Sequence, residues 1–166
     1  MSNKLSREEV RQQIIAAIVE AFQDVRRDGG ITIHEADVID SYGFHGTREA
    51  ARQKDTEIHW QEVPSEKLEK LSEVFPFLDS KGFHFYIPAY MKWSLENLHS
   101  RTSDSVYGTV GSLQANRKKQ FALFNAAQSA AIFDFLSFMA KYEDCEDAKR
   151  AIARYWDKSR REARKP

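Results

Sequence analysis

The chain has 166 residues, of which 42% are hydrophobic and 30% are charged. This composition is typical of a globular protein and excludes a disordered chain, and the length is sufficient to bury a substantial apolar core. Lysine and arginine together number 25, as do aspartate and glutamate, so a net charge of zero provides no overall field to attract nucleic acid or an acidic membrane.

Capping signals predict the first two helices. Ser6 and Glu9 form a capping box, and apolar residues at helical spacing then predict a helix that stops at Asp28-Gly29-Gly30. Thr32 and Glu35 form a second capping box, which predicts another short helix. We therefore expect the chain to begin with helical structure.

The middle of the chain predicts short helices at 47–54 and after Pro64, followed by a β-hairpin over about 74–87. Its two arms, 75–78 and 83–87, are rich in residues that favour strands. Between them Asp79 stands at the first position of a four-residue turn and Gly82 at the last, where glycine can adopt the left-handed conformation. The second arm would point alternate side chains toward a core.

The last third predicts a helix from Pro88, a long polar loop over 100–119 unless a short strand interrupts it, and a strand at QFALF. Asn125 and Gln128 then cap a long helix, and a shorter helix follows it. The fold class expected from these elements is α+β, with five or six helices around a small antiparallel sheet. We expect one globular domain over residues 1–166, with a basic tail at 158–166.

The single cysteine, Cys145, cannot form an intramolecular disulfide, and no apolar run is long enough to cross a bilayer. We therefore expect a cytoplasmic protein without a membrane segment. The basic tail lacks aromatic residues that could stack on bases, so we do not expect nucleic-acid binding. A zero net charge does little to oppose self-association, so the composition is compatible with a homo-oligomer.

Several stretches of the sequence resemble a family of small bacterial proteins known only as a domain of unknown function. They are AFQDVRRDGGITIHEADVIDSYG, ARQKDTEIHWQEV, FPFLDSKGFHFYIPAYM and LFNAAQSAAIFDFL. The resemblance extends from about Ile14 to Trp156 and implies a single-domain bacterial protein, but it carries over no activity, cofactor or site residue. Its most specific part is a motif formed by Leu78, Asp79, Gly82, Phe83, Phe85, Tyr86, Pro88, Ala89, Tyr90 and Met91.

Exposed aromatic side chains would suit the binding of a protein partner. In the predicted hairpin, His84 and Tyr86 lie on the face opposite the core, where they could join nearby rings in an aromatic-lined groove. The alternative is that they are half-buried and structural. The candidate binding surface comprises His84, Tyr86, Tyr90, Trp93 and Tyr107.

Histidines and carboxylates are concentrated between His34 and His59. His34 and Asp37 share a helix face and could ligate a divalent cation, with Asp55 or His59 arriving from the following segment. The alternative is that Glu35 completes a cap and the other groups face water. We favour this second interpretation, without a metal site; on the first, the candidate metal ligands are His34, Asp37, Asp55 and His59.

No nucleophile elbow, phosphate-binding loop or dinucleotide fingerprint occurs in the sequence. We therefore favour a cytoplasmic protein-interaction module over an enzyme, with an unidentified protein partner and no cofactor. The alternative function is a metal-dependent hydrolase that uses the four candidate ligands.

Overall fold

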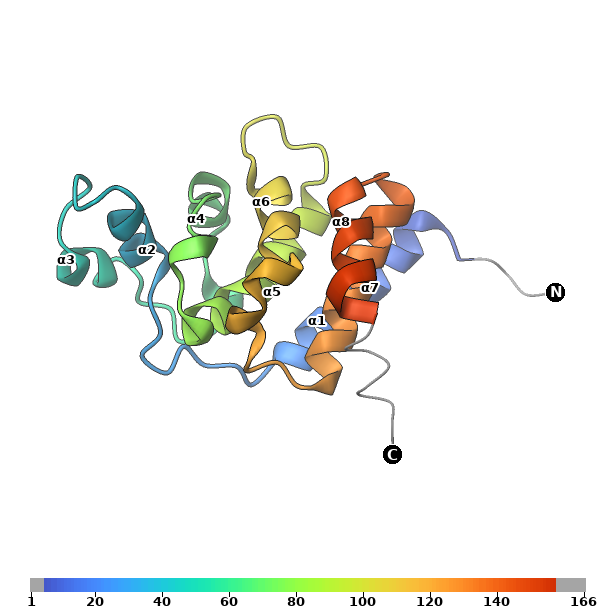
Figure 1. Ribbon diagram of the computed structural model, residues 1–166, viewed down its shortest axis with the longest axis horizontal. Helices are drawn as coiled ribbons and strands as arrows, with labels where there is room; N and C mark the ends of the chain where they lie inside the picture. The colour runs from blue at the N-terminus through green and yellow to red at the C-terminus, as the bar shows by residue number, and fades with distance from the viewer. Residues whose placement is uncertain (1–4, 158–166) are drawn as a thin grey trace. The chain divides into compact units, whose positions relative to one another are not determined.

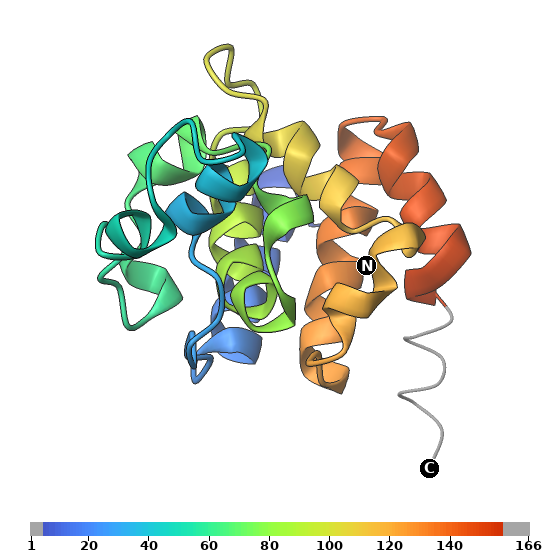
Figure 2. The ribbon, with the colours of Figure 1, turned by 60° about the vertical axis from the view of Figure 1, so that its left-hand side comes forward.

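The computed structural model describes residues 5–157, which form helices and connecting turns without a β-strand (Figures 1 and 2). Within this region one isolated antiparallel bridge pairs Arg26 with His59. The expected α+β class is therefore wrong, because the small antiparallel sheet is absent from these residues. The contacts divide the chain into two compact units, one made of residues 24–123 and the other of 1–23 with 124–166.

The unit that contains both ends of the chain is built on α1 (Arg7–Phe22) and α7 (Ala126–Tyr142), which pack against each other. Helix α8 (Glu146–Ala151) and the π-helical turn η4 (Ile152–Trp156) pack on α7. The predicted capping box of α1 is confirmed, as is the predicted cap of α7 by Asn125 and Gln128, which the structure shows to be a capping box. The expected basic tail, 158–166, lies outside the described residues.

The second unit is organised around α5, a helix of 17 residues. It contacts α4, α6, η1 and η3, while α2 packs on α3 and on η2. The elements of this unit are α2 (Ile33–Asp40), α3 (Arg48–Arg52), η1 (Trp60–Glu62), α4 (Ser65–Lys70), η2 (Phe75–Phe77), α5 (Ser80–Glu96), α6 (Ser105–Ser112) and η3 (Ala115–Phe121).

The predicted β-hairpin is wrong, because its first arm is the turn η2 and its second arm is the first half of α5. Asp79, expected in a tight turn, is the N-cap of α5 and accepts a hydrogen bond from the Gly82 N–H at 2.7 Å. Twelve of the 17 residues of helix α5 are buried, so the polar stripe that distinguishes it from a strand is narrow. Strand-forming aromatic residues are therefore compatible with a largely buried helix.

Gly82 is needed for close packing and not for a left-handed conformation. A Cβ at Gly82 would lie 2.3 Å from the carbonyl oxygen of Ile31, and a Cβ at Gly30 would lie 2.4 Å from the Gly82 nitrogen. The same Asp79 carboxylate accepts a hydrogen bond from the Ile31 N–H at 3.0 Å. The segment before α2 is therefore fixed directly against the first turn of α5.

The segment expected to be a long loop, 100–119, contains helix α6 and most of η3. The expected strand at QFALF is also wrong, since Gln120 and Phe121 end η3. Gln120 donates hydrogen bonds to the carbonyl oxygens of Phe75 and Leu78, at 2.8 and 2.7 Å. These contacts attach the segment to η2 and to the start of α5.

Candidate functional site

Helix α2 connects two features of the second unit. Its N-terminus rests on a buried group of charged side chains, and its C-terminus leads into a loop with exposed aromatic rings. The predicted capping box is confirmed, since Thr32 accepts from the Glu35 N–H and Glu35 accepts from the Thr32 N–H. The start of the helix is thus fixed by local bonds before any tertiary contact is considered.

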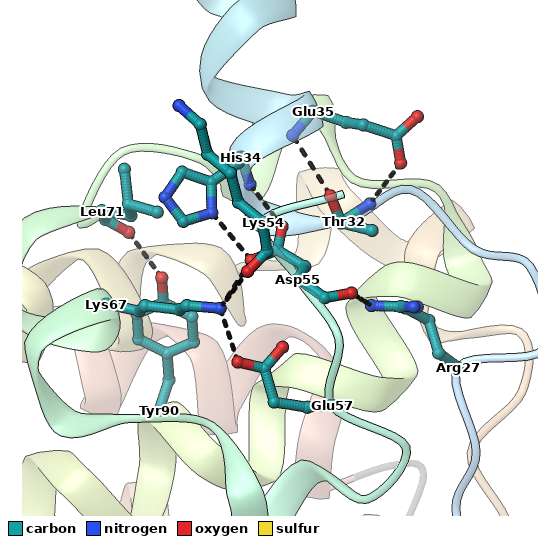
Figure 3. Close-up of polar contacts among 10 residues, drawn as sticks. All are labelled: Arg27, Thr32, His34, Glu35, Lys54, Asp55, Glu57, Lys67, Leu71 and Tyr90. Carbon is teal, nitrogen blue, oxygen red and sulfur yellow. Dashed lines mark hydrogen bonds and ion pairs between the residues drawn. The ribbon is translucent and has the colours of Figure 1, made fainter. Parts of the chain in front are cut away.

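Asp55 is the centre of the buried charged group, and its side chain is completely inaccessible to solvent. The carboxylate accepts hydrogen bonds from the His34 N–H at 3.0 Å and from the His34 Nδ1 at 2.7 Å (Figure 3). Lys67 of α4 donates to the same carboxylate at 3.0 Å. We call Asp55, His34, Lys67 and Glu57 the Asp55 cluster.

Lys67 uses its ammonium group to join three acceptors. Besides Asp55 it donates to the carbonyl oxygen of Lys54 at 2.7 Å and to Glu57 Oε1 at 2.5 Å. Burial by itself would lower the pKa of Lys67, but the two carboxylates outweigh this effect and raise it. The ammonium group is therefore charged and has an acceptor for each of its protons.

The pKa of Asp55 is held well below its ordinary value. Burial alone would raise this pKa, but hydrogen bonds from His34, Thr32 and Lys67 favour the ionised form more strongly. The backbone N–H of His34 belongs to the first turn of α2, where the helix dipole also favours a negative charge. Asp55 is therefore ionised at neutral pH and attaches the N-terminus of α2 to α4.

A buried tyrosine lies beside this cluster. The Tyr86 hydroxyl has no hydrogen-bond partner among the described residues, and neither has Glu57 Oε2. Burial and the nearby Asp55 charge raise the pKa of Tyr86, while the neighbouring Arg27 guanidinium opposes the shift. Arg27 itself donates to the Asp55 carbonyl oxygen at 2.8 Å. Tyr86 therefore stays protonated in a polar part of the core.

His34 has the arrangement of a general base, because a buried carboxylate binds Nδ1 and leaves the opposite ring nitrogen turned away from it. The side chain is 23% exposed. Among the described residues, however, the imidazole makes its polar contact with Asp55 and with no serine, threonine or cysteine. The pair thus lacks a contacting nucleophile, and its clear effect is to anchor α2.

The structure does not bring the four candidate metal ligands together. His34 and Asp55 are in contact as described, but Asp37 binds His45 at 2.8 Å and His59 lies against Arg26. Within residues 5–157, no group of three or more histidine, cysteine, aspartate or glutamate side chains has the geometry to hold a metal ion. Asp55 is paired with the Lys67 ammonium group instead.

The five candidate binding residues are divided between core and surface. Tyr86, Tyr90 and Trp93 are buried in α5, and the Tyr90 hydroxyl donates to the Leu71 carbonyl oxygen at 2.5 Å. His84 is half-buried, whereas Tyr107 on α6 is 74% exposed. Binding by these residues stays a prediction, for which Tyr107 offers a large accessible ring.

The loop from Ser41 to Gly46, here called the aromatic loop, exposes two rings that the sequence analysis did not single out. Tyr42 is 99% exposed and Phe44 is 89% exposed. The backbone of Tyr42 has a φ of 52°, in the left-handed region that residues other than glycine rarely adopt. It stands directly after the C-cap Ser41, where glycine is the usual residue.

Hydrogen bonds fix the backbone of the aromatic loop. The Gly43 N–H donates to the Val38 carbonyl oxygen at 2.9 Å and the Tyr42 N–H to that of Ile39 at 3.2 Å, which is the pattern of a Schellman motif. His45 closes the loop by binding Asp37 of α2. A sequence signal was present, since SYGFHG places two aromatic residues among glycines and polar residues just after a helix.

Glu35 links α2, the helix that precedes the aromatic loop, to α3, the helix that follows it. Its buried carboxylate pairs with Arg52 at 2.7 Å and with Arg48 at 3.5 Å. Figure 1 shows α2 and α3 side by side, in agreement with their packing contacts. The aromatic loop is therefore the connection between two helices that a buried carboxylate ties together.

Comparisons with known proteins identify the family. No helix within residues 5–157 combines the length and the apolar character that a membrane crossing requires. Searches of curated proteins and of solved structures gave no match. A family model, described as a family of unknown function (DUF6714), matches residues 10–160. This match covers nearly the whole chain and confirms the resemblance seen in the sequence, so the protein belongs to this family of unknown function.

Proposed function

We propose that the protein is a protein-interaction module and that the aromatic loop is its main contact surface. The observation that carries this proposal is the exposure of Tyr42 and Phe44, at 99% and 89%. Exposed apolar side chains are common on protein surfaces, but large aromatic rings are the residues that contribute most to binding energy at interfaces. Two such rings, separated by Gly43 alone, lie close together in the sequence.

The conformation of Tyr42 supports a role outside folding. A left-handed backbone costs a residue with a side chain about 1 kcal/mol relative to glycine, and the exposed ring recovers none of this through packing. Glycine at this position would therefore make the folded protein more stable. Strained residues of this kind are concentrated at functional sites.

The loop is also held in one conformation before any partner arrives. Its hydrogen bonds to the end of α2, together with the His45–Asp37 contact, fix the backbone from which both rings extend. The Asp55 cluster holds the other end of the same helix. A rigid loop loses little conformational entropy on binding, so more of the contact energy appears as affinity.

The partner that fits this surface is a folded protein with an apolar pocket for the rings of Tyr42 and Phe44. Each aromatic ring buries about 150–250 Å² when it is covered completely, which is enough for an anchor in a small interface. We place this interaction in a bacterium, as the family resemblance implies, and in its cytoplasm, since the one cysteine of the chain, Cys145, offers no disulfide. An exposed aromatic on α6, Tyr107, provides a second candidate contact.

The test is affinity capture from a lysate of the source organism with wild-type protein and with the variants Tyr42→Gly and Phe44→Ser. We expect specific captured proteins that are lost with both variants. Ile58→Ser is the matched control, because Ile58 is also an exposed apolar side chain, 65% accessible, outside the loop. Tyr107→Ser tests the contact on α6 in the same experiment.

The outcomes are distinct. Identical captured proteins for the wild type and for both loop variants would refute the loop as a contact surface. Loss with Tyr107→Ser alone would move the surface to α6. Binding of the purified protein to lipid vesicles, lost with the loop variants, would replace the protein partner by a membrane surface.

A further inference from the structure

An open groove runs along the line where α1 meets α7, in the unit that contains both ends of the chain. Its volume is about 350 Å³. The two helices that form it are antiparallel. At one end Arg7 of α1 pairs with Glu143, directly after α7, and at the other end Gln128 of α7 donates to the Ala21 carbonyl oxygen at 3.2 Å.

The lining of the groove follows the surface spacing of both helices. On each helix the lining residues recur at steps of three and four, which places them on one face. They are Val10, Gln13, Ile14 and Ala17 of α1, and Asp134, Ser137, Phe138, Lys141 and Tyr142 of α7. Ile14 and Phe138 are buried, whereas Val10 and Ala17 are half-buried. An apolar strip along two antiparallel helices is the kind of surface that a second helix pair covers in a four-helix bundle.

The lining is complementary to itself in size. A two-fold axis that crosses α1 at the middle of its lining would bring Val10 of each copy opposite Ala17 of the other. An axis that crosses α7 at the middle of its lining would bring Ser137 opposite Phe138 in the same way. The contacts at the two ends of the helix pair place these midpoints at nearly the same level, so one axis serves both helices. Each contact then joins a large side chain to a small one, a combination that packs without voids.

The charges of the groove are also complementary to themselves. Asp134 and Lys141 line it from the same face of α7, seven residues apart in the sequence. The same two-fold axis would place Asp134 of each copy opposite Lys141 of the other, so that two symmetry-related ion pairs flank the apolar contact. A second copy of the chain therefore supplies the matching acid and base by symmetry. The net charge of zero adds no long-range repulsion between the copies.

We propose that the groove between α1 and α7 is the interface of a symmetric homodimer, in which these helices of two copies form an antiparallel four-helix bundle. The helices have 16 and 17 residues and are therefore each about 25 Å long. Every helix of the bundle is antiparallel to its neighbours, which is also the favourable orientation of the helix dipoles. This surface belongs to the unit without the aromatic loop, so it does not depend on the function proposed for that loop.

The experiment is sedimentation velocity of the full chain over a series of concentrations, from about 1 μM to about 1 mM. We expect the mass to rise from 19.2 kDa toward twice this value, with a dissociation constant in the micromolar range, because two helices from each copy form an interface of modest size. High salt should weaken the dimer, since it screens the two ion pairs. The loop variants Tyr42→Gly and Phe44→Ser should dimerise like the wild type.

Four variants locate the interface. Ser137→Arg places a long charged side chain at the centre of the groove and should abolish the dimer, while circular dichroism shows that the monomer stays folded. Asp134→Lys and Lys141→Asp should each weaken the dimer by about tenfold, because each change turns two attractive pairs into two repulsive ones. The double variant with both changes should restore dimerisation, since the swap recreates both pairs. Lys70→Asp, which reverses an exposed lysine on α4 outside the groove, is the matched control.

Three results would overturn the proposal. The first is a monomer at every concentration of the series, which would leave the groove to a helix of another protein. The second is a dimer that survives Ser137→Arg, which would place the interface elsewhere. The third is a double variant that dimerises no more tightly than the two single variants, which would show that the copies do not pair Asp134 with Lys141.

Discussion

The carboxylate of Asp55 binds His34 twice, through the backbone N–H at 3.0 Å and through the ring Nδ1 at 2.7 Å. One bond caps the first turn of α2, and the other orients the imidazole. Because Lys67 donates to the same carboxylate, α2 and α4 share one buried anion. This residue therefore determines how firmly the helix that carries the aromatic loop is held.

Replacing Asp55 by asparagine should destabilise the protein by about 3 kcal/mol. The change removes the buried negative charge and leaves Lys67 with Glu57 as its one carboxylate partner, and breaking a buried ion pair typically costs about 3–5 kcal/mol. Urea unfolding measures the effect. Asp40→Asn is the control, since Asp40 is exposed, and a loss for Asp55→Asn no larger than for this control would contradict a structural role for the cluster.

The difference in stability between wild type and Asp55→Asn should depend on pH. The folded-state pKa of Asp55 is lowered, whereas the unfolded pKa is about 3.9. The folded protein thus binds this proton less readily, so the contribution is complete above about pH 4 and is lost as the pH falls from there toward the folded pKa. Urea unfolding between pH 6 and pH 2.5, as far as the fold persists, should show the two proteins converge. A constant difference would show that the charge contributes nothing.

Two neighbouring tyrosines of α5 should respond differently to loss of the hydroxyl group. Tyr86→Phe should leave stability unchanged within about 0.5 kcal/mol or raise it, because the buried hydroxyl has no hydrogen-bond partner among the described residues. Tyr90→Phe should cost about 1 kcal/mol, since it removes the bond to the Leu71 carbonyl oxygen. Chemical denaturation of both variants measures their stabilities. A larger loss of stability for Tyr86→Phe than for Tyr90→Phe would contradict this interpretation.

Replacing two helical glycines by alanine should change the free energy of unfolding in opposite directions. Gly82→Ala should destabilise the fold by about 2 kcal/mol, because the new Cβ would lie 2.3 Å from the Ile31 carbonyl oxygen and force the backbone apart. Gly111→Ala in α6 should stabilise it by about 0.5–1 kcal/mol, since no atom lies within 4 Å of the added Cβ. Thermal unfolding gives both values. A neutral Gly82→Ala would show that the contact adjusts freely.

Tyr42→Gly should raise stability by about 1 kcal/mol. Glycine adopts the left-handed backbone without strain, and the exposed ring contributes no packing that would be lost. Phe44→Ser serves as the comparison. Its position has no left-handed backbone, so this change should leave the stability unaltered. The midpoint of thermal unfolding measures both. A destabilised Tyr42→Gly variant would indicate that the ring packs on the protein itself.

Sequence reasoning succeeded where local bonds determine the structure. The caps at Ser6, Thr32 and Asn125 were all predicted, since each needs only residues three positions apart. It failed at α5, where aromatic residues and an Asp–Gly spacing are shared by a hairpin turn and a helix start. Burial of most of α5, which depends on its neighbours in space, decided between the two.

The candidate site was predictable only in part. The grouping of His34 with Asp55 anticipated their contact, but the partner that neutralises Asp55 is Lys67, which the sequence does not single out. Exposure of Tyr42 could not be read from an alternating or helical pattern, because it follows from the way α2 ends. Charge pairing across segments and side-chain exposure in loops both require the tertiary structure.

The double acceptance by Asp79 has a consequence for how the chain folds. Its bond to Gly82 can form within an isolated helix, but its bond to Ile31 joins residues 48 positions apart. Closing a loop of this length lowers the conformational entropy of the chain before the contact can stabilise it. The start of α5 is therefore encoded locally, whereas its attachment to the segment before α2 is a non-local step, of the kind that slows folding.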